Sequence, residues 1–145
     1  MINYLELKNY FENHKYNNQK SRQDCDILCN IEEFIKPDDI KIFYPKNLFL
    51  EDKKLEMYVL SEDKVLIGRA LEGNNIELKI LYLKDLKNFT CECINDCGEY
   101  YHKLILKFTT DELVFDKKED TNRSWGHKFE EQIKNIIKIL MNRTT

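Results

Sequence analysis

The chain has 145 residues, of which 42% are hydrophobic and 34% are charged. This length and composition are typical of one water-soluble globular domain, and no apolar run approaches the roughly 18 residues that a membrane-spanning helix needs. The formal net charge of −3 disfavours a dedicated nucleic-acid-binding protein, because such proteins usually carry a basic excess. We therefore expect a single domain over residues 1–145, with no nucleic acid among its partners and no transmembrane segment.

The N-terminal residues show no basic stretch followed by an apolar core, so we expect no signal peptide. The chain holds five cysteines, an odd number that fits reduced thiols in a cytosol better than a disulfide framework. Both features predict a cytoplasmic protein.

Two helices are predicted in an N-terminal helical segment, residues 1–37. An apolar stripe over residues 1–13 indicates a short first helix. Ser21, followed three residues later by Asp24, resembles a capping arrangement, and helical spacing of apolar residues then continues to Pro37.

From residue 40 onward the periodicity is that of β-strands. Alternating apolar residues and Gly/Asn turns predict about seven strands, most of them joined in antiparallel hairpins. The expected strands cover residues 40–50 (broken at Pro45), 55–60, 65–71, 76–82, 86–94, 101–108 and 112–115.

At Ser124 the period changes to that of an amphipathic helix that ends near Met141. One face of this helix is apolar: Trp125, Phe129, Ile133, Ile136, Ile137 and Leu140. Thr121, Asn122 and Ser124 are all suitable N-caps, so the first turn stays open. The predicted class is α+β: a bent antiparallel sheet or partly open barrel over residues 40–141, capped by this C-terminal helix and preceded by two helices.

Two stretches carry a resemblance to a known family. Residues 58–67, Tyr-Val-Leu-Ser-Glu-Asp-Lys-Val-Leu-Ile, resemble the hairpin of bacterial pleckstrin-homology-like (PH-like) domains. Residues 80–87, Ile-Leu-Tyr-Leu-Lys-Asp-Leu-Lys, resemble the strand and corner that follow it, with Asp85 and Leu86 matching the corner. The resemblance covers about residues 55–141 and implies a PH-like fold. The chain also resembles the small uncharacterised families of low-GC Gram-positive bacteria, which carry no activity to transfer.

The cysteines provide one candidate metal site. Cys91 and Cys93 are two residues apart and would lie on one face of a strand. Cys97 in the following turn and His102 on the partner strand could complete a tetrahedral zinc set. The spacing lacks the paired C-x2-C knuckles of zinc ribbons, and free cysteine is commonly a small buried hydrophobe. We therefore assign no cofactor and no metal from the sequence.

Two further groups are candidates for binding. Phe43 and Tyr44, with Tyr100 and Tyr101, could form an aromatic surface for a partner, because aromatic residues are favoured at the centres of interfaces. Lys53, Lys54, Lys64 and Arg69 are the nearest equivalents of the cations with which some PH domains bind anionic lipids, although acidic residues are interspersed among them.

No nucleophile, phosphate-loop or metalloprotease motif is present, so we expect a protein that is not an enzyme. Four acidic pairs, at residues 38–39, 51–52, 62–63 and 119–120, are interpreted as solvated carboxylates.

Three functions remain open. The first is an interaction module that binds an unidentified protein or peptide along a strand edge or beside the C-terminal helix. The second is a peripheral domain for anionic lipid, and the third is a zinc- or thiol-dependent protein using Cys91, Cys93 and Cys97.

Overall fold

The computed structural model describes residues 2–143. The helices are α1 (Tyr4–His14), α2 (Gln19–Glu32), α3 (Lys117–Asp120) and α4 (Gly126–Met141), with 3-10 turns η1 (Pro37–Asp39), η2 (Leu83–Asp85) and η3 (Arg123–Trp125). The strands are β1 (Ile42–Lys46), β2 (Glu56–Leu60), β3 (Lys64–Ala70), β4 (Ile76–Tyr82), β5 (Asn88–Asp96), β6 (Glu99–Lys107) and β7 (Glu112–Asp116).

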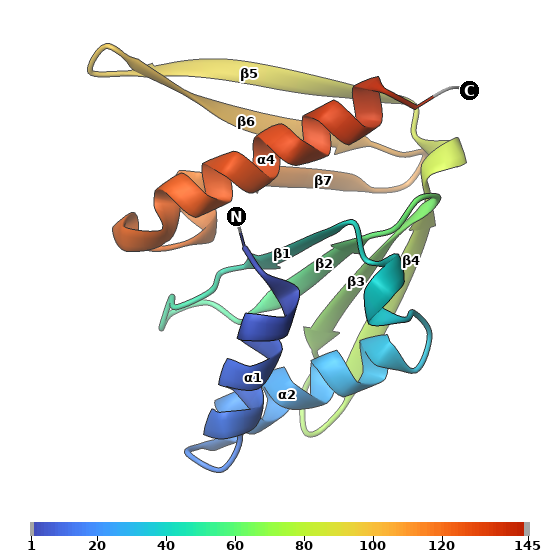
Figure 1. Ribbon diagram of the computed structural model, residues 1–145, viewed down its shortest axis with the longest axis vertical. Coiled ribbons are helices and arrows are strands. Elements are labelled where there is room, and N and C mark those ends of the chain that lie inside the picture. The colour runs from blue at the N-terminus through green and yellow to red at the C-terminus, as the bar shows by residue number, and fades with distance from the viewer. Residues whose placement is uncertain (1, 144–145) are drawn as a thin grey trace.

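The strands of the described residues form two antiparallel sheets. The first has the order β1-β2-β3-β4 and the second the order β5-β6-β7, and η2 joins them. Helix α4 lies across the second sheet, contacts β6 and β7, and also reaches β1 of the first sheet (Figure 1). The predicted α+β class, with seven antiparallel strands and a C-terminal helix, is therefore confirmed, but the strands form two sheets and not the single bent sheet or barrel that the sequence predicted.

The first sheet is covered on both faces. Helices α1 and α2 lie on the side of this sheet away from the second sheet (Figure 1), and Tyr4 of α1 packs edge-on against Phe43 at 5.2 Å between ring centroids. On the other face Tyr44 packs edge-on against Phe115 of β7 and Phe129 of α4, at 4.8 and 5.0 Å. Buried residues from the N-terminal helices, both sheets and α4 thus share one hydrophobic core.

Helix α4 buries the stripe that its sequence predicts. Phe129, Ile133 and Ile136 are fully buried and Leu140 nearly so. The helix begins at Gly126, because the side chain of Asn122 accepts a hydrogen bond from the Trp125 amide (3.0 Å) and caps the preceding turn η3 instead.

Two boundaries differ from the sequence-based expectation. Helix α2 begins at Gln19, before Ser21, because Asn18 is its N-cap. The Asn18 side chain accepts a hydrogen bond from the Ser21 amide at 2.8 Å. Pro45 does not break its strand but pairs with Met57 inside β1. Proline is tolerated there because β1 is an edge strand with one unpaired side.

Among residues 2–143, no helix combines the length and the apolar character needed to cross a membrane.

Candidate functional site

The β5–β6 hairpin brings three of the four candidate metal ligands together. Cys93 and His102 are directly opposite each other in the strand register, and Cys91 lies two residues from Cys93 on the same face. One ligand atom from each of the three residues lies within 4.8 Å of the others. The hairpin therefore places two sulfurs and one imidazole at a single point of the second sheet.

Glu130 of α4 holds the histidine of this cluster from the other side. Its Oε2 lies 2.6 Å from His102 Nδ1, and its Oε1 accepts the His102 backbone amide at 3.0 Å. The pairing of β6 with β7 ends at Lys103 and Asp116. The His102 amide, which faces the same side of β6, therefore has no partner on β7 and donates to the Glu130 carboxylate instead. Glu130 is only 9% exposed.

The contact with Glu130 fixes which nitrogen of the neutral His102 ring carries the proton. An ionised carboxylate accepts hydrogen bonds and cannot donate them, so Nδ1 carries the proton that faces Glu130, and in the neutral ring Nε2 is the nitrogen with the lone pair. Histidines that bind metals in proteins are commonly oriented by such a carboxylate. Glu130 could not be found from the sequence, because it is 28 residues from His102 and no local spacing links the two.

The remaining cysteines lie elsewhere. Cys97 is in the exposed turn after β5, in a left-handed conformation (φ 55°), and does not belong to the cluster of the described residues. The prediction that it folds back towards Cys91 is therefore wrong. Cys25 and Cys29 are on α2, which covers the first sheet on the side away from the β5–β6 hairpin. Cys25 is buried in the hydrophobic core, and Cys29 is exposed.

The cluster is not arranged as a thiol nucleophile. Burial raises the pKa of Cys91, and the adjacent Cys93 raises it further. A raised pKa keeps the thiol protonated near neutral pH, whereas a nucleophilic cysteine needs the thiolate. What the three side chains do offer is a soft donor set for a thiophilic cation such as Zn²⁺.

The structure contradicts the predicted aromatic partner surface at three of its four residues. Phe43 and Tyr44 are 2% and 0% exposed and Tyr101 is 8% exposed, so none of these three can form a free surface. Tyr101 is covered by the amines of Lys117 and Lys118, which lie 5.4 and 5.0 Å from its ring centroid. The fourth candidate, Tyr100, is 63% exposed.

The four candidate lipid-binding cations do not form a patch. Lys64 and Arg69 are near opposite ends of β3 and pair with Asp63 and Glu77. Lys53, in the loop after β1, pairs with Glu119. Lys54 is exposed in the same loop. The neighbouring carboxylates offset the positive field that an anionic lipid surface would need.

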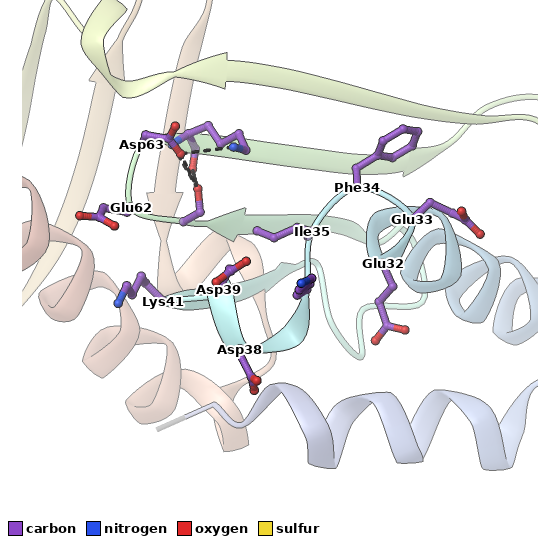
Figure 2. Close-up of a pocket in the computed structure, with 12 residues that line it drawn as sticks. Glu32, Glu33, Phe34, Ile35, Asp38, Asp39, Lys41, Glu62 and Asp63 are labelled. Atoms are coloured by element: carbon purple, nitrogen blue, oxygen red, sulfur yellow. Dashed lines mark hydrogen bonds and ion pairs between the residues drawn. The ribbon is translucent and has the colours of Figure 1, made fainter.

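A surface pocket of about 560 Å³ lies between the end of α2, η1 and the β2–β3 turn (Figure 2). It is rich in carboxylates, but in Figure 2 the side chains of Glu62 and Asp38 point away from each other, and Asp63 is bonded to Ser61 and Lys64. Glu32 turns to Tyr4 and Lys8 of α1 instead. These are the solvated and paired carboxylates that the sequence suggests.

A smaller pocket, about 150 Å³, lies between α1, α2 and the loop after β1, and the half-buried carboxyl group of Asp24 lines it. Burial raises the pKa of Asp24 to about 6, and nearby Lys20 only partly opposes this shift. Ionisation of Asp24 is therefore less favourable in the folded protein than in the unfolded chain.

We expect Asp24→Asn to stabilise the protein at neutral pH. The folded pKa lies above the ordinary value of 3.8, so the stability that the protonated group contributes is complete below about pH 4 and is lost as the pH rises through 6. A shift of this size is worth about 2–3 kcal/mol. Urea unfolding from pH 4 to pH 8 should show the variant gaining over the wild type across that window. Asp26→Asn, at an exposed position of the same helix, is the control, and an equal gain there would contradict this assignment.

Comparison with known proteins gives one match. A search of curated proteins and a search of solved structures each find no match to this chain. A family model described as a protein of unknown function (DUF3908) matches residues 3–131, which include both sheets and the cluster on the β5–β6 hairpin. The chain therefore belongs to the DUF3908 family of proteins of unknown function.

Proposed function

We propose that this chain is a cytosolic, non-catalytic interaction module with a PH-like fold, and that it binds an extended peptide segment of a partner protein along the free edge of β5. Seven antiparallel strands are followed in the chain by a C-terminal helix, and this order is what the resemblance to PH-like domains implies. The observation that carries the proposal is the state of the β5 edge.

Strand β5 is nine residues long and, among the described residues, pairs only with β6. Figure 1 shows it at the outer side of the second sheet, with α4 crossing β6 and β7 instead. Its sequence, NFTCECIND, contains neither proline nor lysine, the residues with which proteins commonly protect an edge strand. A nine-residue edge without these two residue types is suited to pairing with an added strand.

The strand register identifies the amides that would receive such a peptide. The Phe108 amide donates towards β7, to Asp111, so the odd-numbered amides of β6 face β5. Through the register, the even-numbered residues of β5 pair with β6. The outward amides are therefore those of four odd-numbered residues: Phe89, Cys91, Cys93 and Asn95.

The free edge of β4 is less suitable than that of β5. Strand β4 also pairs on one side only among the described residues, but it carries Lys79, which is bonded to Asp111 of the β6–β7 loop. A lysine on an edge strand disfavours strand addition. This contrast selects β5.

The proposal can be tested with a peptide selected on the intact protein from a random-peptide display library. The selected peptide is then synthesised in two forms, with N-methyl groups on its odd or on its even amides. Strand pairing uses alternate amides, so one form should lose at least about tenfold in affinity while the other keeps most of it. Equal behaviour of the two forms, or failure of any peptide to be enriched over an unrelated control protein, would contradict the proposal.

Two lysine substitutions locate the binding edge. Thr90→Lys adds a charge to β5 on the face opposite the cysteines, and Ile80→Lys adds one at a 45% exposed position on β4. We expect Thr90→Lys to weaken binding of the selected peptide about tenfold and Ile80→Lys to leave it unchanged. The reverse result would move the site to β4.

A further inference from the structure

The geometry points to a Zn²⁺ site formed by Cys91 Sγ, Cys93 Sγ and His102 Nε2, with Glu130 as the positioning residue for the histidine. This inference does not depend on peptide binding at the β5 edge, because it rests on the cluster described above. The three residues come from both strands of the hairpin and the carboxylate from α4.

Core packing does not account for the two cysteines. Cys93 is exposed and Cys91 is only half-buried, and neither belongs to the hydrophobic core, in which Cys25 is found. A thiol that serves as a small hydrophobe is normally buried. Two cysteines in register with a histidine on an exposed strand thus call for another explanation.

The histidine is prepared for a metal before any metal binds. Glu130 accepts hydrogen bonds from both the Nδ1 proton and the backbone amide of His102, so ring and backbone are held by one nearly buried carboxylate. This leaves Nε2 of the neutral ring as the nitrogen that can bind zinc. A structural ion pair alone would not require two thiols within 4.8 Å of the same ring.

The distances are compatible with tetrahedral coordination after a small adjustment. Zn–S bonds of about 2.3 Å and Zn–N bonds of about 2.0 Å separate ligand atoms by roughly 3.5–3.8 Å. Because the ligand atoms all lie within 4.8 Å of one another, each pair needs to close by at most about 1 Å. A rotamer change of the exposed Cys93 side chain can supply much of this.

Binding would exchange protons for the cation. Each thiol loses one proton to solvent as its sulfur binds, while the imidazole binds in its neutral form, so Zn²⁺, two thiolates and one histidine sum to zero charge. Within residues 2–143 no further Cys, His, Asp or Glu joins the three. The fourth position would then be taken by water or by a ligand from solution, as in zinc sites with three protein ligands.

The test uses the full chain, reduced and without a histidine tag, titrated with Zn²⁺ against a chromophoric chelator. We expect one Zn²⁺ per chain, release of about two protons, and tighter binding as the pH rises. In the wild type, Zn²⁺ should protect Cys91 and Cys93 from alkylation and leave Cys29 and Cys97 reactive. Sub-stoichiometric binding, or equal protection of all four exposed or half-exposed thiols, would overturn the proposal.

Matched variants assign the ligands. Cys91→Ser and Cys93→Ser should each weaken binding at least about 100-fold, whereas Cys97→Ser and Cys29→Ser should leave it unchanged. Glu130→Gln should weaken it about 10- to 100-fold while the melting temperature of the metal-free protein changes little. Loss of binding in Cys97→Ser, or full binding in Cys93→Ser, would contradict the assignment. If a cysteine variant does not fold, the alkylation pattern of the wild type decides the question.

Discussion

Replacing Asp120 by alanine should lower the free energy of unfolding by about 3–5 kcal/mol, because a nearly buried carboxylate with three partners would be removed. Asp120 is 1% exposed. Its Oδ2 accepts the Tyr44 hydroxyl at 2.5 Å and the Asp116 amide at 2.9 Å, and Lys46 lies 3.7 Å from Oδ1. Truncation would leave the Tyr44 hydroxyl and the Asp116 amide without their acceptor and would remove the ion-pair partner of Lys46, which also donates to the Val114 carbonyl. Urea unfolding at neutral pH measures the effect.

The adjacent residue provides a matched control. Glu119 precedes Asp120 in α3, but its side chain is 72% exposed and its ion pair with Lys53 spans 3.6 Å at the surface. Glu119→Ala should therefore cost less than about 1 kcal/mol. Similar losses for the two variants would mean that the Tyr44–Asp120 contact does not stabilise the fold.

The second large effect is expected at Gly68 of β3, where α2 approaches the sheet most closely. A Cβ at this position would lie 2.7 Å from Ile27 Cγ2 and 3.1 Å from Ile31 Cδ1. Gly68→Val should lower the free energy of unfolding by about 3 kcal/mol, because α2 must move away from β3, and Gly68→Ala should cost about 1–2 kcal/mol.

Gly126 serves as the control for this series. A Cβ there would meet only Lys117 Cδ, at 3.8 Å, and the backbone is already helical. Gly126→Ala should be neutral or slightly stabilising, since alanine has the higher helix propensity. If Gly68→Val unfolded at the same urea concentration as the wild type, the packing of α2 on β3 described here would be wrong.

The sequence predicts local features well. Alternation and Gly/Asn turns place β2, β3 and β4 within one residue of their observed bounds, because a strand with a neighbouring turn is specified by residues close in the chain. The apolar stripe of α4 is found for the same reason.

Burial on both faces of a strand is harder to predict. Phe43 and Tyr44 are neighbours and point to opposite faces of β1, so at most one would be buried in a sheet with one solvated face. The structure buries both, because α1 covers one face and β7 and α4 cover the other. A strand covered on both sides has no polar face to reveal it.

Contacts between distant segments account for the rest of the site. Asp120 belongs to an acidic pair that was expected to be solvated, yet its partner Tyr44 is 76 residues away. Glu130 and His102 meet only because α4 folds back over β6. Cys97, in contrast, is close to Cys93 in the chain, but it lies in the turn after β5 and is not part of the cluster.

The proposed function depends on β5 accepting a strand, and residue-resolved amide hydrogen exchange tests this most directly. The exchange is measured with and without a saturating peptide from the library selection. The account predicts slower exchange at the four outward amides, those of Phe89, Cys91, Cys93 and Asn95, with no change along β4. Protection confined to β4 or to the helices, with these four amides unaffected, would contradict it.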